Sequence, residues 1–397
     1  MAEMAHAKEI AVVGGGIAGL VAAVSCAERG AAVTLHEAHS TLGGRGRTTP
    51  GPYIAHDGPH VFYDDGPHWT WLRDRGLVGK ATRVPLRAAT TIRYRLDGRV
   101  RRGLTSTLLK VAAGRRRTAP IDVDFDTWAT GQFGAEAARQ AASAISVVTY
   151  VPDTGALSAR FVWDLFCRVF TPSYPAVRYV RGGWPAVIDR LAARARELGV
   201  AIETGSRVTA MPSCPAIVAT ELSSARLLLG DDDLHWDSGN CVLLDIAVTK
   251  RRGDPFALFD LDEGGFAECY SRPDPTLAPR GEALYQADLP IREGESHPAA
   301  LTRLETMVDG MLPGWRDRTT WRRDAVAKDR TGAIDRPGRT WRDRPAVHRG
   351  NGVFLAGDMV AAPGMRGEIA INSAITAADG ALAAAGIGSA VGQVGQG

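Results

Sequence analysis

Lysine, paired cysteines and long apolar runs are all scarce in this chain of 397 residues. Lysine stands at only five positions, so arginine supplies nearly all of the 47 basic side chains. The formal net charge is +3, and a balance this close to zero gives no reason to expect nucleic acid as a partner. No segment reaches the ~20 uninterrupted apolar residues that a membrane-spanning helix needs. We therefore expect a soluble protein, or at most one that rests on a membrane surface.

The cysteines are few and lie far apart. They stand at Cys26, Cys167, Cys214, Cys241 and Cys269. No pair has the C-x-x-C spacing of a redox or metal site, so we predict no bound metal. An odd number of scattered thiols is typical of a reducing compartment, and the N-terminal stretch leads into glycines without a cleavage signal. The sequence therefore favours a cytoplasmic protein.

The chain begins with the pattern of a strand, a helix and a second strand. Residues 8–13 are rich in Ile and Val, as in a buried parallel strand. Residues 17–29 have the pattern of a helix with small side chains, and residues 32–36 form a second apolar run. This order predicts a βαβ-type unit at the start of the chain.

A glycine-rich loop connects this first strand to the helix. Gly14, Gly16 and Gly19 have the spacing G-x-G-x-x-G. In a dinucleotide fingerprint the first glycine allows a tight turn, the second leaves room for the pyrophosphate, and the third lets helix and strand pack closely. The first helical residues, Ile17 and Ala18, would then offer N–H groups and the positive end of the helix dipole to the phosphates.

Two further features follow the fingerprint. Glu37 ends the second strand, 18 residues after Gly19, where a carboxylate accepts ribose hydroxyls and repels the 2′-phosphate of NADP. Gly43-Gly44-Arg45 comes next, with two glycines for a close backbone approach and a guanidinium for a phosphate. This second feature, placed six residues after Glu37, favours FAD over plain NAD.

The stretch from Glu37-Ala38 to Leu42-Gly43-Gly44-Arg45 resembles the flavin amine oxidase and phytoene desaturase superfamily. Near the other end, residues 354–358 resemble the strand and aspartate of that family. The resemblance implies FAD as the cofactor, with Ala38 beside the ribose acid and with Gly357 and Asp358 at the ribityl or pyrophosphate part. Gly364-Met365 and the helix from Ile369 resemble the family segment beneath the flavin pyrimidine, where a helix N-terminus would stabilise reduced flavin.

The family likeness is looser between these ends. Residues 182–219 resemble a return into the first domain, which implies that Val208 contacts the adenine through its backbone. Within this stretch, residues 205–208 are expected to turn into another strand. Gly58, Pro59 and His60 resemble the segment that runs along the flavin ring. His60 is the candidate catalytic residue, as a base or as a group that orients the ring. A packed histidine without a catalytic role is the alternative.

The fold class expected from these patterns is α/β. A Rossmann-like FAD-binding domain is built from three discontinuous segments, and an α+β substrate domain with a mixed sheet and helices is inserted between them. The predicted boundaries are residues 1–85, 175–235 and 336–397 for the first domain, and 86–174 and 236–335 for the second. In the second domain, Asp97-Gly98 predicts a hairpin turn, and residues 125–170 have a mostly helical pattern.

The resemblance implies an FAD-dependent oxidoreductase that dehydrogenates a small or apolar organic substrate by hydride transfer. Amine oxidases carry a lysine near the flavin on a strand of the substrate domain. The comparable strand, residues 241–248, has none before Lys250, which speaks against an amine oxidase. A redox-neutral isomerase and an amine oxidase remain the alternatives, and a binding protein of the same fold is the least favoured. The sequence leaves the oligomeric state open.

Residues 99–117 form a basic segment with an apolar middle. Such a segment suits a membrane surface or an anionic partner. A solvated basic segment is the favoured interpretation.

Overall fold

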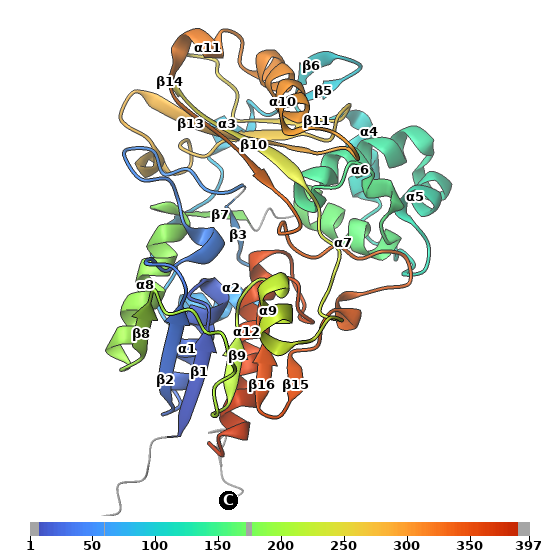
Figure 1. Cartoon of the computed structure of the whole chain (residues 1–397). Coiled ribbons are helices and arrows are strands. Elements are labelled where there is room, and N and C mark those ends of the chain that lie inside the picture. Colours follow the sequence, from blue (N-terminus) through green and yellow to red (C-terminus); the bar gives the residue numbers. More distant parts are fainter. Residues whose placement is uncertain (1–7, 59, 172–176, 388–397) are drawn as a thin grey trace, which may run out of the picture. The chain divides into compact units, whose positions relative to one another are not determined.

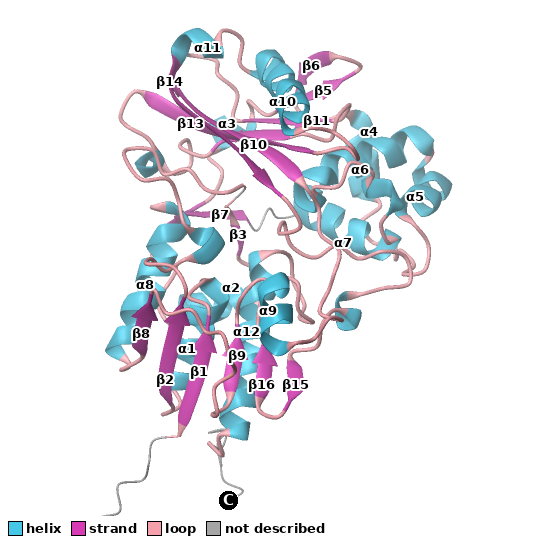
Figure 2. Ribbon diagram, in the orientation of Figure 1, coloured by secondary structure: helices cyan, strands magenta, loops and turns pink. Residues whose placement is uncertain are grey.

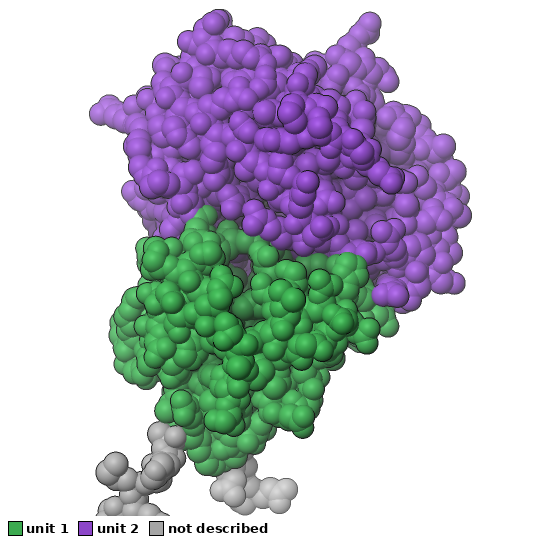
Figure 3. All heavy atoms as spheres, in the orientation of Figure 1, with its two compact units in different colours: residues 1–47, 187–236, 341–397 green, residues 48–186, 237–340 purple. Residues whose placement is uncertain are grey.

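The computed structural model describes residues 8–58, 60–171 and 177–387. The chain divides into two compact units (Figure 3). Unit 1 comprises residues 1–47, 187–236 and 341–397, and unit 2 comprises residues 48–186 and 237–340. Unit 1 is made of three separated segments, and the two segments of unit 2 lie between them in the sequence. These bounds differ from the predicted ones at residues 48–85, 175–186, 236 and 336–340; the strands of residues 62–63, 81–82 and 177–180 pair with one another within unit 2.

Unit 1 is built on a six-stranded sheet in the order β15-β16-β9-β1-β2-β8 (Figures 1 and 2). All neighbouring strands are parallel except β15 and β16. Its elements are β1 (Glu9–Val13), α1 (Ile17–Ala27), β2 (Ala32–Glu37), η1 (Gly44–Gly46), most of α8 (Gly183–Glu197), β8 (Ala201–Thr204), β9 (Ala216–Val218), α9 (Leu222–Leu229), η4 (Trp341–Asp343), β15 (His348–Gly350), β16 (Val353–Leu355) and α12 (Gly367–Ala384).

Small side chains explain how the helices of unit 1 pack. α1 and α12 lie side by side and contact the central strands, and both are rich in alanine on their buried faces. Gly380 of α12 leaves no room for a side chain, because a Cβ there would lie 2.3 Å from the Phe354 ring. The predicted strand–helix–strand pattern is confirmed at β1, α1 and β2.

One local expectation in unit 1 is wrong. Residues 205–208 were expected to turn into another strand, but the structure has a loop there. The physical reason is that backbone N–H groups of this segment bond to the end of β2 and do not pair with a neighbouring strand. Gly205 donates its N–H to His39 O at 2.8 Å, and Ser206 donates to Glu37 O at 2.9 Å. The loop is therefore held against the end of β2 and does not continue a sheet.

Unit 2 is built on a seven-stranded mixed sheet in the order β14-β10-β13-β12-β11-β5-β6, with a small sheet β3-β7-β4. All described neighbours are antiparallel except β11 and β5. Its elements are β3 (Phe62–Tyr63), α2 (Pro67–Asp74), β4 (Ala81–Thr82), α3 (Leu86–Ala89), β5 (Arg93–Leu96), β6 (Arg99–Arg102), α4 (Ser106–Ala113), α5 (Phe125–Phe133), α6 (Ala135–Thr149), η2 (Thr154–Ala156), α7 (Ala159–Phe170), β7 (Val177–Val180), β10 (Cys241–Thr249), β11 (Ala257–Asp260), β12 (Phe266–Cys269), η3 (Pro275–Leu277), β13 (Glu282–Pro290), α10 (His297–Met311), α11 (Trp315–Arg318) and β14 (Thr319–Ala327).

Local sequence signals account for several of these elements. The predicted hairpin between β5 and β6 turns at Asp97 and Gly98, which have φ of 52° and 69°. Two positive φ values at such a turn are what the Asp-Gly pair tolerates. The mostly helical pattern expected for residues 125–170 is confirmed by α5, α6 and α7. The basic segment forms β6 and then α4, which Thr105 caps by accepting the N–H of Leu108.

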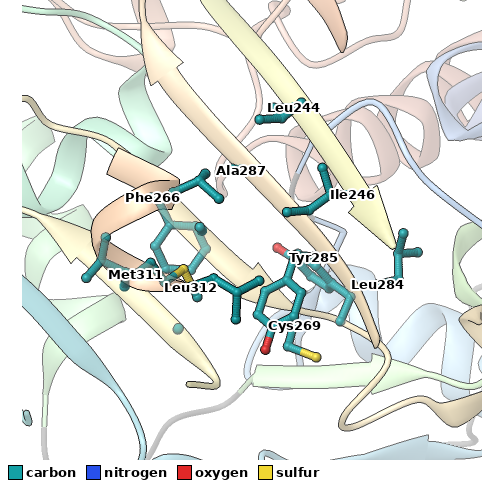
Figure 4. Close-up of a cluster of buried hydrophobic side chains, with 14 of the residues drawn as sticks. Leu244, Ile246, Phe266, Cys269, Leu284, Tyr285, Ala287, Met311 and Leu312 are labelled. Atoms are coloured by element: carbon teal, nitrogen blue, oxygen red, sulfur yellow. The ribbon is translucent and has the colours of Figure 1, made fainter. Parts of the chain in front are cut away.

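The large sheet of unit 2 has one apolar face, which forms the core of the unit. Leu244, Ile246 and Ala287 project from this face toward Met311 and Leu312 at the end of α10 (Figure 4). Side chains in a strand alternate between the two faces, so the residues between these belong to the other face. Across the part of the chain that the structure describes, no helix is long and apolar enough to cross a bilayer.

Candidate functional site

The glycine loop of unit 1 makes a turn that only glycines permit. Gly14 has φ of +109°, and a Cβ at this position would lie 2.6 Å from the carbonyl oxygen of Ala219. A Cβ at Gly19 would lie 1.8 Å from the carbonyl oxygen of Gly14. The first glycine of the motif thus permits the turn, and the third lets α1 pack closely on it, as the fingerprint predicts.

The N-terminus of α1 is left open for a ligand. No side chain caps it, and its first turn contains no acidic residue. Among the described residues beyond its chain neighbours, a Cβ at Gly16 would approach one heavy atom within 4 Å, Gly44 Cα at 3.9 Å. Gly43 donates its N–H to Gly15 O at 2.8 Å, which fastens the second glycine segment beside the first. Unpaired N–H groups at a helix start with open space around them suit a phosphate group.

Glu37 is the buried acid of this site, with 6% of its surface exposed. One carboxylate oxygen accepts the N–H of Gly15 at 2.7 Å, and the other accepts the N–H of His39 at 2.8 Å. A carboxylate can accept about four hydrogen bonds, so each oxygen keeps capacity for another donor. The carboxylate is thus held rigidly between the glycine turn and the end of β2, with room to accept hydroxyl groups.

The loop after β8 lies beside this acid. Ser206 donates its N–H to Glu37 O and its hydroxyl contacts His36 Nδ1 at 3.1 Å. Val208 follows in the same loop and is half-buried, as is Ala38 on the β2 side. The structure therefore brings the predicted adenosine residues to one end of β2.

Arg45 and Asp358 meet although 313 residues separate them in the chain. The guanidinium donates two hydrogen bonds to the carboxylate, at 2.7 and 2.6 Å. Such a bidentate pair fixes both side chains in direction as well as distance. Asp358 follows β16, and Gly357 before it donates to Ser373 Oγ of α12 at 2.9 Å. The sequence predicted both residues for the cofactor but did not predict that they pair.

The start of α12 differs from the expectation in one respect. Gly364 has φ of +118°, and the N–H of Met365 is donated to the Glu368 carboxyl group at 2.9 Å. Glu368 lies in the first turn of the helix and is buried, as is Ile369 after it. The Glu368 carboxyl group therefore already interacts with the positive end of the α12 dipole, which was expected to stabilise reduced flavin.

Two of the predicted residues, Gly58 and His60, belong to unit 2, and Pro59 lies outside the described residues. His60 is buried and stacks between two other rings. Its centroid lies 3.5 Å from that of His56 and 4.0 Å from that of Tyr270. Burial lowers the pKa of His60 to about 3, although contacts with the Gly58 backbone and the Gln286 side chain oppose the shift. The imidazole is thus neutral at pH 7, which limits its strength as a base.

A row of polar residues, here called the polar row, lies beside this stack and was not predicted from the sequence. Glu268, Gln286, Asp245 and Arg323 lie in register on four neighbouring strands of the large sheet. On β10 and β12 the sequence signal was one acidic residue within an apolar strand, whereas β13 carries both Gln286 and Asp288 and β14 is largely polar. Where a lysine was sought on β10, the strand carries Asp245. No group of three or more potential metal ligands occurs within residues 8–58, 60–171 and 177–387.

Comparisons with known proteins bear on the fold. Residues 12–75 match the family model of an NAD(P)-binding Rossmann-like domain. No curated protein matches the chain. An oxidoreductase from Methanosarcina mazei is similar in structure, with a TM-score of 0.72 at 14% identity, over 94% of this chain and 100% of that one.

Two enzymes with named activities are also similar in structure. Cyclohexylamine oxidase from Brevibacterium oxydans has a TM-score of 0.70 at 16% identity, over 95% of this chain and 98% of the other. Reduced UDP-galactopyranose mutase has a TM-score of 0.68 at 14% identity, over 96% of each chain. The chain therefore shares its fold with an amine oxidase and a mutase, and the expected fold class, a Rossmann-like α/β domain with an inserted domain, is confirmed.

Proposed function

We propose that the protein is an FAD-dependent oxidoreductase that dehydrogenates a small or apolar organic substrate. The observation that carries the proposal is the meeting of three stretches in unit 1: the Gly14–Gly19 turn, Glu37 at the end of β2, and the Arg45–Asp358 pair. All lie at the carboxyl ends of parallel strands, which is where open α/β sheets bind their ligands.

The residues of this site fit an adenine dinucleotide. The free acceptor capacity of Glu37 suits the two ribose hydroxyls, and a carboxylate there disfavours the 2′-phosphate of NADP. The open space around Gly16 and the uncapped amides of Ile17 and Ala18 suit the pyrophosphate. When bound, FAD supplies the acceptor for a hydride, and the protein contributes binding and orientation.

Arg45 and Asp358 would have different roles in this site. Asp358 holds the guanidinium in place, so that Arg45 remains pre-organised beside the glycine segment. The carboxylate keeps unused acceptor capacity for a hydroxyl of the ribityl chain. Substituting either residue should therefore weaken FAD binding, because the residue that remains also loses its partner.

His60 would act by orienting a bound group. Its pKa of about 3 supports a neutral hydrogen-bonding ring and weakens the case for proton abstraction at neutral pH. Activity that is flat between pH 5 and 8 in the wild type, and that falls in His60→Phe at every pH, would agree with this role. A group titrating near pH 6.5 that disappears in His60→Phe would contradict it.

A redox-neutral isomerase is the second candidate. The likeness to reduced UDP-galactopyranose mutase favours it. An amine oxidase is less favoured in spite of the likeness to cyclohexylamine oxidase, because β10 carries Asp245 and no lysine. Anaerobic addition of the substrate separates the two leading candidates, since a dehydrogenase bleaches the flavin spectrum and an isomerase does not consume an acceptor.

The decisive experiment is a visible spectrum of the purified protein followed by titration with FAD. Glu37→Gln keeps the shape of the side chain but removes its charge, and we expect FAD to bind about 10- to 100-fold more weakly. Arg45→Met should also weaken FAD binding. Glu197→Gln, an exposed glutamate at the end of α8, is the matched control. A colourless protein that takes up no FAD, or unchanged affinity in both variants, would overturn the proposal.

A further inference from the structure

One end of the large sheet of unit 2 gathers basic side chains from four separate stretches of the chain. β10 ends there at Thr249, and its neighbour β13 begins there at Glu282. β5 begins at the same end, because Arg93 lies beside Leu258 near the start of β11. Six cations stand at this end, which we call the basic end: Arg93, Arg102, Lys250, Arg251, Arg252 and Arg280.

Contacts between these stretches show that they lie together. Arg93 stands directly opposite Arg102 in the β5–β6 hairpin, and its guanidinium donates to Gly253 O at 3.3 Å. Lys250 donates its backbone N–H to Gly281 O at 2.9 Å. The loop from β10 to β11 therefore crosses the ends of β13 and β12, which lie between these two strands in the sheet. It brings its three cations beside the β5–β6 hairpin and the turn at Gly281.

Two acids at the basic end already have other partners. Asp254 is paired with Arg318 at 2.9 Å. Glu282 accepts hydrogen bonds from the hydroxyl groups of Tyr53 and Thr320. Within the described residues, none of the six cations pairs with a carboxylate. Two of them face each other across the β5–β6 hairpin, where like charges destabilise the pairing. The basic end therefore carries positive charge that the protein itself does not neutralise.

Cations and acids are matched at the opposite end of the same sheet. Arg95 pairs there with a buried aspartate of β11. Arg292 and Arg303 both pair with Glu263, in the turn between β11 and β12. The excess of positive charge is thus confined to one end, so the arginine-rich composition of the chain does not explain it.

An exposed leucine stands beside the basic end. Leu86 begins the short helix α3, and 87% of its surface is exposed. α3 is fastened near the start of β11, because Thr91 Oγ1 accepts the N–H of Phe256 at 3.1 Å and donates to Ala88 O at 2.8 Å. One exposed leucine is ordinary on a protein surface, but a leucine among cations has the composition of an interfacial contact.

We propose that the basic end is a docking surface for a lipid bilayer with anionic headgroups. Its cations lie on loops and strand ends from β10 to β6, a span of five strand spacings or about 24 Å, which suits a flat surface with many negative charges. Each basic side chain near such a surface strengthens binding about 5-fold. Leu86 enters the headgroup region, where its side chain leaves water. Docking requires no bound FAD, because all of these residues belong to unit 2.

Co-sedimentation of the purified protein with vesicles tests the charge requirement. Vesicles of phosphatidylcholine are the uncharged reference, and vesicles with about one-third phosphatidylglycerol supply the negative charge. At low salt we expect the anionic vesicles to bind at least about 10-fold more tightly than the reference. About 1 M salt, where the Debye length is about 3 Å, should remove this preference.

Arg251→Gln/Arg252→Gln tests whether the charge acts from this end of the sheet. It removes two exposed cations, and we expect anionic vesicles to bind about 25-fold more weakly. Arg115→Gln/Arg116→Gln is the matched control, which removes the same charge from exposed positions after α4. Binding should change less than about 2-fold in this control, since screening confines the attraction to nearby charges. Thermal melting verifies that both variants remain folded.

Leu86→Ser distinguishes a bilayer from an acidic protein as the partner. It should weaken binding to anionic vesicles about 3- to 10-fold, because the leucine no longer leaves water there. Binding to poly-glutamate, the probe for an acidic protein surface, should stay as in the wild type. Leu109→Ser is the control, at a leucine of α4 that is 54% exposed, and should leave both affinities unchanged.

Three outcomes would overturn the inference. These are equal binding to both kinds of vesicle, an equal loss in the two double variants, or unchanged vesicle binding in Leu86→Ser. The last outcome, together with tight binding of poly-glutamate, would assign the basic end to an acidic protein. The FAD content of the same preparations, read from the visible spectrum, reports separately on the proposed oxidoreductase.

Discussion

The two large sheets of this protein carry their polar groups in different places. In unit 1, Glu37 and Asp358 stand at or just beyond the ends of parallel strands. In unit 2, Asp245 and Gln286 stand in the middle of antiparallel strands. The first arrangement gathers residues at one edge of a sheet, and the second spreads them in a row across its face.

This difference determines how each polar group is satisfied. Glu37 is held by two backbone N–H groups, which no substitution other than one to proline removes. Asp245 is held by the side chains of Gln286 and Arg323 alone among the contacts described for it. The site of unit 1 should therefore tolerate changes around it, while the row of unit 2 should depend on each partner.

The strongest test of this contrast breaks the buried ion pair of the polar row. Arg323→Leu leaves the Asp245 carboxylate buried without its counter-charge, and we expect a loss of about 3 kcal/mol in unfolding free energy. The double variant Asp245→Asn/Arg323→Leu removes the stranded charge and should recover part of that loss. Urea unfolding of all variants measures both effects, and strictly additive losses would show that the two side chains are not coupled.

A second test concerns the close packing of unit 1. Gly19→Ala places a methyl group 1.8 Å from the carbonyl oxygen of Gly14, so the turn and α1 must separate, at a cost of about 2 kcal/mol. Gly131→Ala is the control at an exposed position of α5, where the added Cβ meets open space and should stabilise by about 0.5–1 kcal/mol. Equal effects of the two substitutions on urea unfolding would contradict this account of the glycine turn.

A third test concerns a dependence on pH that comes from Glu268. Its pKa is raised from 4.5 to about 8, so between these values the folded protein keeps a proton that the unfolded chain releases. Folding stability contributed by this group is therefore full below pH 4.5 and is lost as the pH rises toward 8, with a slope of at most about 1.4 kcal/mol per pH unit.

Glu268→Gln imitates the protonated side chain and should remove this dependence. The stability of the variant relative to the wild type should rise steadily from pH 5 to 8 and then level off. Glu293→Gln, at an exposed position, serves as the control. A constant difference between Glu268→Gln and the wild type across this range would mean that Glu268 is ionised in the folded protein.

Sequence reasoning was most successful in unit 1. The strand, the glycine spacing and the acid at residue 37 are all encoded within one short stretch, so their relation could be predicted locally. Even there, the Arg45–Asp358 pair was not predicted, because a contact between residues 313 positions apart depends on the order of strands in the sheet. Residues 205–208 were expected to form a strand, but the backbone N–H groups of Gly205 and Ser206 bond to residues 39 and 37, which hold the segment as a loop.

In unit 2 the sequence did not indicate which polar side chains contact one another. Asp245 appears as one acidic residue within an apolar strand and Gln286 lies two residues before Asp288 in another, and nothing in either strand indicates that the two lie opposite each other. The same holds for His56, whose tautomer depends on a backbone N–H at residue 184. These relations arise from strand register and packing, which a single sequence does not encode locally.

By itself, the sequence determined the α/β fold class and the glycine turn with its acid, because short-range sterics and helix geometry act on neighbouring residues. Only the tertiary structure decided which distant side chains meet, namely Arg45 with Asp358 and the polar row with the ring stack. The physical reason is that burial and pairing depend on the complete fold: an aspartate has the same local chemistry in every sequence, and its partners and its dielectric surroundings decide its charge.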